Sequence, residues 1–227
     1  MMSAPLVSVV VPVLGDAGPA ARLLAQLHAY AAVEVIVIDG GQDPELDRLA
    51  DSPRTRVMRS APGRGRQMNA GAAVATGEWL LFLHADSILP DGWLDACRLL
   101  AEANAGWFQF ALDDDAWQAR VLEQLVAWRV KILTLPYGDQ GLFVRRDVFV
   151  RLGGYRDMPL LEDVELVRRL VASGPVVSLP FPLRTSSRRW RHDGWWWRSA
   201  RNVAIIVLYA WGVSPAVLVR WYRGGHG

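Results

Sequence analysis

The sequence predicts an α/β fold with a mostly parallel central sheet and helices on both of its faces. Short apolar runs rich in β-branched residues alternate with helical patterns through the first half of the 227-residue chain. These runs are apolar at nearly every position, as is typical of strands that are covered on both sides. Hydrophobic residues make up 52% of the chain, which is enough for a sizeable core. Alternation at this spacing predicts βαβ units.

The strands and helices of the first half follow in a regular order. The predicted strands are the apolar runs at residues 7–13, 33–38, 55–60 and 78–83. The predicted helices cover residues 17–31, 64–76 and 91–100, with weaker helical character over 44–51. Pro19 lies near the start of the first helix, Gly77 follows the second as its expected cap, and Pro90 and Asp91 supply a start for the third.

The second half is less regular. A helix is predicted over residues 113–133, and the segment 135–149 reads as a loop, a strand and the start of a helix. A glycine-rich loop then leads into a helix that ends at Gly174, and residues 175–180 form a last short strand. We therefore expect one domain over residues 1–190 and a helical appendage over 191–227.

Composition limits the cofactors and the location of the protein. Cys97 is the only cysteine, which excludes an internal disulfide and any cysteine-based zinc or iron–sulfur centre. The first apolar run has no Lys or Arg before it and is interrupted by Pro12, so we expect a buried strand rather than a signal peptide. A cytoplasmic location is expected.

Acidic side chains stand directly after two of the predicted strands. Asp39 follows the second strand, and His84, Ala85 and Asp86 follow the fourth. Ligands of parallel sheets bind beyond the carboxyl ends of the strands, so these positions predict a nucleotide site. The alternatives are an Asp-Gly turn at Asp39 and a helix cap at Asp86. Pro90 and Asp91 already start the next helix, which makes a capping role for Asp86 unnecessary.

Five segments in this order resemble the inverting family-2 glycosyltransferases of GT-A fold, and the likeness is greatest to a bacterial subgroup with a His-Ala-Asp motif. The resemblance implies transfer of a sugar from a nucleoside-diphosphate donor to an acceptor hydroxyl, with inversion at the anomeric carbon. The segments are "VSVVVPVLGD", "VIVIDGGQDP", "GRGRQMNAGA", "LFLHADSILP" and "GDQGLFVRR…GGY…PLLEDVELVRRL".

The resemblance implies a divalent metal, Mn2+ or Mg2+, that neutralises the leaving diphosphate. Asp86 matches the metal-binding acid of the family's Asp-x-Asp motif, in which His84 replaces the first carboxylate. His84 then either ligates the metal or bonds to ribose or phosphate. His192 lies near the position of a late metal ligand in many GT-A enzymes, although Asp193 competes for its ring.

Further residues are expected at the nucleotide by the same resemblance. Asp39 matches an acid that accepts a hydrogen bond from the base, and Gly40 leaves room for the ring. Arg66 is expected at phosphate or base, with Arg64 either sharing that role or lying at the surface. The other expected contacts are Pro12, Val13, Asn69, Ala85, Arg188, Arg189 and Trp190. The loops "PVLGD" and "GGQDP" depart from the usual pattern, and the Gln of the processive Gln-x-x-Arg-Trp motif is missing.

The later helix begins with the pair that matches the family's catalytic acids. Asp163 is expected to take the proton of the acceptor hydroxyl, with Glu162 as its supporting neighbour. Two acids at a helix N-terminus also complement the helix dipole without any catalytic role. Gly138, Asp139 and Gln140 fall where family members touch the acceptor; a purely structural loop is the alternative.

The tail is basic and rich in tryptophan. Residues 184–227 hold eight Arg, one Asp and six of the eleven Trp. The uncharged stretch 203–219 is marginal for a spanning helix, since one needs about 20 residues and this one contains Gly212 and Pro215. The sequence leaves three alternatives: docking on a membrane surface, packing on the domain or on a second subunit, and spanning. Docking would use snorkelling arginines on both sides of the stretch, namely Arg198, Arg201, Arg220 and Arg223.

Two other functions compete with sugar transfer. A nucleotidyltransferase shares the fold, but such enzymes usually carry a basic, glycine-rich loop after the first strand, which "PVLGDAGPAAR" lacks close to the strand end. A non-enzymatic module that binds membrane or nucleic acid would leave the strand-end acids unexplained. We therefore expect a nucleotide-sugar donor, with UDP-sugar favoured over GDP-sugar, and an unknown hydroxyl acceptor for which a lipid is one candidate. A nucleic-acid partner is disfavoured, and tail docking would place the protein on the inner face of the cell membrane.

Overall fold

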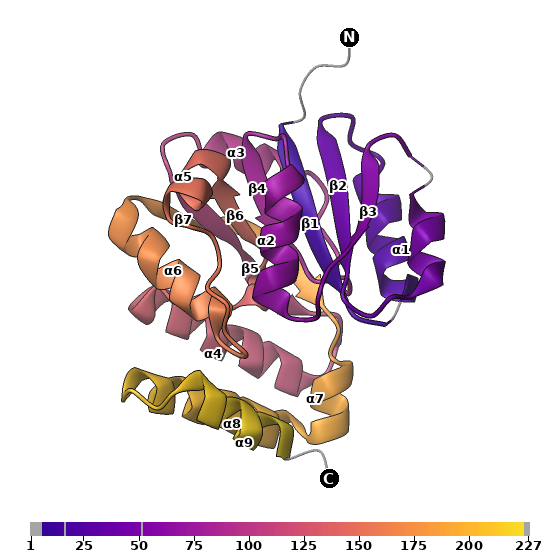
Figure 1. The fold of residues 1–227 in the computed structure, drawn as a ribbon. Helices are drawn as coiled ribbons and strands as arrows, with labels where there is room; N and C mark the ends of the chain where they lie inside the picture. The colour runs from indigo at the N-terminus through magenta and orange to yellow at the C-terminus, as the bar shows by residue number, and fades with distance from the viewer. Residues whose placement is uncertain (1–5, 16, 51, 225–227) are drawn as a thin grey trace.

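The protein is built on one seven-stranded sheet, with the strand order β3-β2-β1-β4-β6-β5-β7 (Figure 1). The computed structural model describes residues 6–15, 17–50 and 52–224. The strands are β1 (Val7–Val13), β2 (Val33–Asp39), β3 (Thr55–Arg59), β4 (Trp79–Phe82), β5 (Ala105–Leu112), β6 (Leu142–Arg145) and β7 (Val176–Thr185). Only β6 runs against the others among these strands. The expected mostly parallel sheet is confirmed.

Helices cover both faces of the sheet. They are α1 (Ala17–Leu27), η1 (Pro44–Leu49), α2 (Arg64–Val74), η2 (Trp93–Asp95), α3 (Ala96–Leu99), α4 (Trp117–Leu133), η3 (Gly138–Gln140), α5 (Arg146–Arg151), α6 (Glu162–Ser173), α7 (Arg188–Asp193), α8 (Trp195–Ala210) and α9 (Pro215–Gly224), where η denotes a 3₁₀ helix. Successive residues of β1 point to opposite faces: Val9 packs with α1, whereas Val10 packs with α2. The strands are apolar at nearly every position because a hydrophobic core lies on each face of the sheet.

The register of the parallel strands brings their carboxyl ends to one edge of the sheet. Val13 at the end of β1 pairs with Asp39 at the end of β2, and Val10 pairs with Phe82 at the end of β4. The segment that follows β4 therefore begins beside the middle of β1 and continues past its end. This edge is where the expected nucleotide site lies.

Two strands differ from the sequence prediction. β5 was not predicted, although its burial is nearly continuous from Ala105 to Leu112. β7 continues five residues beyond the expected end at Pro180 and includes Pro182. It forms an edge of the sheet, where a strand tolerates proline because one side of its backbone has no ladder partner to satisfy.

The role expected for Gly77 is wrong. α2 ends at Val74, and Ala75 is its cap residue, with its backbone N–H bonded to the carbonyl of Ala72. Gly77 instead donates its N–H to Ser8 Oγ at 2.8 Å, and a Cβ at this position would lie 2.7 Å from the Ser8 nitrogen. Glycine is needed there because β4 enters the sheet in close contact with β1.

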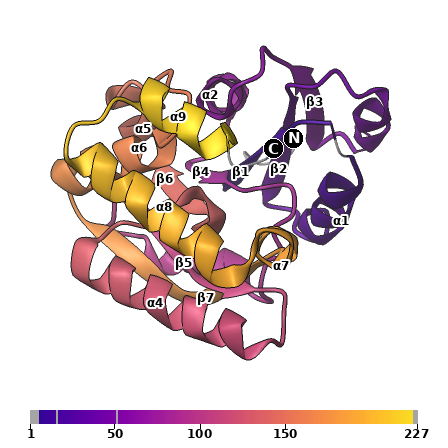
Figure 2. The same cartoon turned by 90° about the horizontal axis from the view of Figure 1, so that it is seen from below.

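The tail folds into helices that pack on the rest of the molecule (Figure 2). Ile205 of α8 and Leu218 of α9 form a buried cluster with Leu161 and Val164. No described helix combines the length and apolar character that crossing a membrane requires. α7 begins at Arg188, so the proposed domain boundary after residue 190 falls inside a helix.

The expectation that Arg198 and Arg201 snorkel toward a membrane is wrong. Both side chains are buried and directed inward. Arg198 Nη1 lies 2.5 Å and Arg201 Nη2 3.4 Å from Asp193 Oδ2 at the junction of α7 and α8. Arg198 also lies over the ring of Trp190, at 5.3 Å from the centroid. Arg201 lies over the ring of Tyr222 on α9, so these arginines join α8 to α7 and α9.

Candidate active site

A cleft of about 1000 Å³ opens beyond the carboxyl ends of β1 and β4. Its lining comes from the end of β1, the start of α2, the segment after β4, the loop before β6, the start of α6, the end of β7, and the tail helices. Among the predicted residues it contains Pro12, Val13, Arg66, His84, Ala85, Asp86, Gly138, Asp139, Glu162, Asp163, Arg188, Arg189 and Trp190. The chain thus brings together residues that lie far apart in sequence.

Asp86 presents a free carboxylate to this cleft. It belongs to a turn after β4, in which the Ser87 N–H donates to the His84 carbonyl at 3.1 Å. No hydrogen bond or ion pair joins the Asp86 side chain to another described residue. The next helical segment starts only at Trp93, with Gly92 before it, so Asp86 does not cap it. This carboxylate is available for a ligand.

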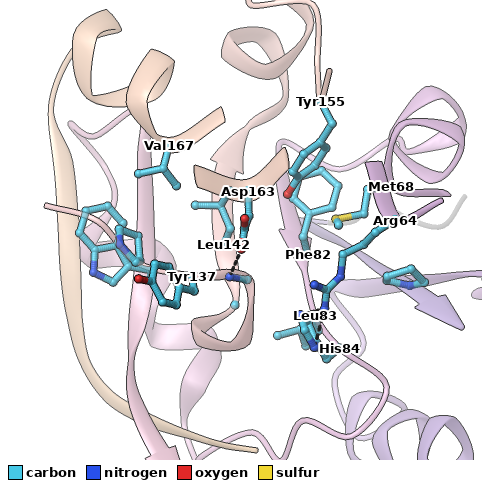
Figure 3. A pocket seen from close by; sticks show the side chains of 15 residues that line it. Arg64, Met68, Phe82, Leu83, His84, Tyr137, Leu142, Tyr155, Asp163 and Val167 are labelled. Atoms are coloured by element: carbon cyan, nitrogen blue, oxygen red, sulfur yellow. Dashed lines mark hydrogen bonds between the residues drawn. The ribbon is translucent and has the colours of Figure 1, made fainter. Parts of the chain in front are cut away.

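His84 stands against the guanidinium of Arg64 (Figure 3). Arg64 Nη2 lies 2.7 Å from Nδ1 of the imidazole and also contacts Nε2. The pKa of His84 is well below its ordinary value because burial disfavours the charged ring and because Arg64 and Arg189 add positive charge nearby. A neutral imidazole is therefore expected here at neutral pH, flanked by two permanent cations.

Asp163 is held in place by backbone groups. Its Oδ2 accepts a hydrogen bond from the Gly138 N–H at 2.6 Å, and its Oδ1 accepts one from the Val164 N–H at 2.8 Å. A Cβ on Gly138 would lie 3.1 Å from Asp163 Oδ2 and 3.2 Å from His84 Nε2. Gly138 therefore fits between the two side chains, and only a residue without a Cβ does so without crowding them.

Glu162 is buried beside Asp163. Burial raises its pKa, and the charge of Asp163 raises it further. Its Oε1 lies 3.9 Å from Arg64 Nη1, which partly offsets this effect. The preceding Leu161 adopts a left-handed backbone with φ of 68°, an uncommon conformation for a residue with a branched side chain. Such local strain is often concentrated at functional sites.

Asp139 has one buried oxygen, Oδ1, for which the described residues provide no hydrogen-bond partner. Burial raises the pKa of Asp139 to about 6; the charge of Arg129 opposes this shift, and the charge of Asp163 adds to it. Arg129 itself lies over the ring of Tyr137, at 3.4 Å from the centroid. Asp139 thus lines the cleft and has one buried oxygen with unused acceptor capacity.

Asp39 and Gly40 are not among the residues that line the cleft. Asp39 is buried, and its two oxygens accept hydrogen bonds at 2.7 Å from the backbone N–H groups of Gly41 and Asp43. A Cβ on Gly40 would lie 3.0 Å from the Gln67 side chain. The space beside Gly40, expected to admit a base ring, is therefore filled by Gln67, and Asp39 shapes its own loop.

Asn69, Gln140 and His192 also lie outside the cleft lining. The Asn69 side chain donates to the Tyr155 carbonyl at 2.8 Å and accepts from the Tyr155 N–H at 2.9 Å. Gln140 is buried and donates to the Phe108 carbonyl at 3.0 Å. His192 is exposed, with Nδ1 2.9 Å from Asp193 Oδ1. The structure does not bring His192 into the cleft with Asp86, so its role as a metal ligand is not supported.

Arg64 and Arg66 lie in different parts of the cleft from those that the sequence predicted. Arg66 lies at the exposed rim and forms a two-pronged ion pair with Asp157, with bonds of 2.8 and 2.6 Å. Arg64 points inward to His84 and Glu162. Because a helix has 3.6 residues per turn, side chains two positions apart, such as those of Arg64 and Arg66, point to roughly opposite sides. The sequence favoured Arg66 as the ligand contact, whereas the structure places Arg64 beside His84 and Glu162.

Several lining residues were not predicted. Gln67 is buried and donates to the carbonyls of Val13 and Ile38, both at 2.8 Å, which ties β1 to β2. Tyr137, Asn202 and Tyr222 also line the cleft. A lone glutamine in a helix of small residues was the available signal for Gln67. Asn202 and Tyr222 carry no such pattern, because their position depends on how the tail packs.

The residues present suit a metal ion that is shared with a diphosphate. The described part of the chain holds no group of three or more His, Cys, Asp or Glu side chains that could bind a metal by themselves. Mg2+ is typically held by one or two carboxylates together with substrate phosphates. Asp86 supplies one free, hard oxygen donor of this kind. This single protein carboxylate fits a cation whose other ligands are the phosphate oxygens of a bound nucleotide.

The first half of the chain matches a known family. Residues 8–113 match the family described as glycosyl transferase family 2. This segment runs from β1 to just past β5 and contains His84 and Asp86, whereas Asp163 and the tail helices lie outside it. No curated protein matches the chain.

Solved structures resemble nearly the whole chain. The mannosyltransferase PcManGT from Pyrobaculum calidifontis, in complex with GDP-Man and Mn2+, has a TM-score of 0.68 at 18% identity, over 94% of this chain and 67% of that one. S. aureus TarS has a TM-score of 0.63 at 16% identity, over 93% and 68%. Glucosyl-3-phosphoglycerate synthase from Mycobacterium tuberculosis, with Mn2+, UDP and glucosyl-3-phosphoglycerate, has 0.52 at 17% identity, over 78% and 70%. The chain therefore has the GT-A fold of glycosyltransferases, and its first half carries the match to family 2.

Proposed function

We propose that this protein is a glycosyltransferase that moves a sugar from a nucleoside diphosphate to an acceptor hydroxyl, with inversion at the anomeric carbon and with help from a divalent metal. One observation carries the proposal. The free carboxylate of Asp86, at the end of a parallel strand, faces the same cleft as the backbone-anchored carboxylate of Asp163. The family match and the GT-A fold support the same reaction class.

The donor diphosphate would bind between β4 and α7. Asp86 would hold Mn2+ or Mg2+, and two of the similar structures contain Mn2+ with a nucleotide. When bound, the metal supplies positive charge that stabilises the departing diphosphate. Arg188 and Arg189 offer guanidinium groups that suit phosphate oxygens, with Trp190 beside them. Neutral His84 can donate one hydrogen bond to ribose or phosphate.

The acceptor would lie on the side of the loop before β6. Asp163 would remove the proton of the acceptor hydroxyl as its oxygen bonds to the anomeric carbon and the bond to the diphosphate oxygen breaks. The Gly138 and Val164 amides hold this carboxylate in one orientation. The entropy cost of orienting the base is therefore already met before the reaction begins. Asp139, which lines the cleft next to Gly138, would bind an acceptor hydroxyl. Glu162 would support Asp163 from the buried side.

Substitution of the two key carboxylates tests the proposal. We expect the full-length protein with Mn2+ to release nucleoside diphosphate from a UDP-sugar or a GDP-sugar. Asp163→Asn should lower the rate by about a hundredfold or more, since a general base typically contributes that much. Asp86→Asn should remove the dependence of the rate on Mn2+. Release of nucleoside diphosphate and the anomeric configuration of the product, from proton NMR, are the measurements.

Asp147→Asn is the matched control, because Asp147 is an exposed acid on α5 that forms ion pairs with Arg145 and Arg151. It should keep the rate of the unaltered protein, and all variants should melt at similar temperatures. Inorganic pyrophosphate as the product would instead indicate a nucleotidyltransferase. An unchanged metal-dependent rate in Asp86→Asn would contradict the role given to this residue.

A further inference from the structure

The outer face of α4 exposes large apolar side chains along its whole length. Trp117, Val121, Leu125, Trp128 and Ile132 are all exposed, and Trp128 keeps 70% of its surface accessible. Their spacing of three and four residues places them on one stripe of the helix. The opposite side of α4 is already buried against β5. The stripe therefore does not belong to the core.

The tail helices carry a second stripe of the same kind. α8 exposes Trp196, Val203 and Val207, and Trp211, which directly follows α8, keeps 81% of its surface accessible. α9 adds Val217 and Trp221. The inner sides of both helices are buried in the cluster around Ile205 and Leu218.

The two stripes meet to form one surface, which we call the basal face: the exposed apolar residues of α4, α8 and α9, together with Trp211 at the end of α8. The rings of Trp117 on α4 and Trp196 on α8 are 5.8 Å apart, which connects the stripes. Figure 2 shows the three helices side by side, and in Figure 1 they lie at the lower end of the molecule. Continuous exposed apolar surfaces of this extent mark interaction sites.

The charges of these helices identify the partner. Glu123 is the only acidic residue of α4, α8 and α9, and it pairs with Arg120 at 2.7 Å. Lys131 and Arg220 are exposed cations in the same helices. A second copy of the chain on this face would bring like charges together. An anionic surface would meet complementary charge and would bury the tryptophans at the boundary between apolar and polar regions, where their rings are favoured.

We propose that the basal face docks on the surface of a lipid bilayer that contains anionic headgroups, with α4, α8 and α9 lying along the membrane plane. Apolar side chains enter the boundary of the acyl region, and Lys131 and Arg220 remain at the phosphates. Asn202 and Tyr222 on the inner sides of α8 and α9 line the cleft, so docking would hold the cleft close to the headgroups. The docking does not depend on which reaction the cleft performs.

Vesicle flotation with the full chain tests this proposal. We expect the protein to float with vesicles of phosphatidylcholine and phosphatidylglycerol and to remain mostly unbound with phosphatidylcholine alone. High salt should weaken the binding by screening the headgroups. The double variant Trp128→Ala and Trp211→Ala should lose binding by about tenfold, because membrane affinity scales with the apolar area inserted. Both side chains are exposed, so the variant should fold normally, which circular dichroism checks.

Val150→Ala is the control, since Val150 is 67% exposed but lies on α5, outside the basal face. It should float like the unaltered protein. The proposal is overturned if the full chain does not float with the anionic vesicles, or if the double tryptophan variant floats equally well. It is also overturned if light scattering shows a dimer that this variant converts to a monomer.

Discussion

Three carboxylates in the cleft have the same chemistry but different surroundings. Asp86 has no partner among the described residues, Asp163 accepts two backbone hydrogen bonds, and Asp139 is half-buried with one buried oxygen unpaired. Each environment suits a different role, because a free carboxylate binds a cation, a fixed one takes a proton in a defined direction, and a half-buried one holds a polar ligand. Environment rather than residue type separates the roles.

Asp139 leads to a prediction about pH. Its pKa of about 6 in the folded protein lies above the ordinary 3.8, because burial disfavours the charged form. A raised pKa means that stability is full below about pH 4 and is lost as the pH rises through 6. Asp139→Asn should remove this loss. We expect the variant to be more stable than the unaltered protein by about 3 kcal/mol at pH 8 and equal to it near pH 4.

Urea unfolding at several pH values measures the difference in free energy. Asp115→Asn is the control, since Asp115 is an exposed acid just before α4. It should leave the pH profile of stability close to that of the unaltered protein. A stability difference for Asp139→Asn that does not change between pH 4 and pH 8 would show that the ionisation of Asp139 is not responsible.

At the scale of elements, α2 fixes the edge of the sheet at which the cleft opens. Gln67 bonds to both strand ends, Gly40 packs against it, and Gly41 approaches the backbone of Gly15, where a Cβ would come within 2.9 Å of the Gly15 nitrogen. The glycines after β2 are therefore required for packing between loops. These contacts leave no room for a side chain at either glycine.

Gly40→Ala should consequently be destabilising. Its Cβ would lie 3.0 Å from the Gln67 amide, so Gln67 must shift and weaken two buried hydrogen bonds. We expect a loss of about 2 kcal/mol, typical of overpacking combined with a strained hydrogen bond. Denaturant unfolding of a double-mutant cycle with Gln67→Ala measures the coupling. Gly40→Ala should cost clearly less in the Gln67→Ala background, and equal costs in both backgrounds would exclude this contact as the cause.

At the scale of the whole molecule, the tail is a wall of the cleft rather than a separate appendage. Asp193 at the end of α7 binds the buried guanidinium groups of Arg198 and Arg201, which joins α7 to α8. Ile205 and Leu218 of the tail pack with Leu161 and Val164 of the domain. Hydrogen bonding to His192, together with Arg198 and Arg201, lowers the pKa of Asp193 to about 2, so it is ionised at neutral pH. Asn202 and Tyr222 then complete the cleft lining.

Asp193→Ala should therefore destabilise the protein strongly. Two buried cations would lose their counter-charge, and breaking a buried ion pair by removal of one partner costs about 3 kcal/mol or more. The midpoint of urea unfolding should fall accordingly. Asp91→Ala, at an exposed acid of the loop before η2, should change the midpoint little. Equal midpoints for the two variants would contradict the anchoring role of Asp193.

The regular elements and the strand-end motif could be predicted because their signals are local. β1, β2 and β4 are continuous apolar runs. Because these strands are parallel, the acids after β2 and β4 were expected at the same edge of the sheet. The strands β5 and β7 were harder to predict from the sequence. β5 carries no alternation of the usual kind, and the length of β7 depends on its position at an edge, which allows its prolines. Neither the presence of β5 nor the end of β7 can be inferred from the residues of the strand alone.

The sequence by itself determined the α/β class, the edge of the sheet where chemistry would occur, and the candidates Asp86 and Asp163. Only the tertiary structure decided that Arg64 rather than Arg66 faces His84, that the space beside Gly40 is filled by Gln67, and that Arg198 is buried at Asp193. The physical reason is that a residue type and its spacing fix local conformation and charge. Which neighbour occupies the adjoining space depends on contacts between segments that are distant in the chain.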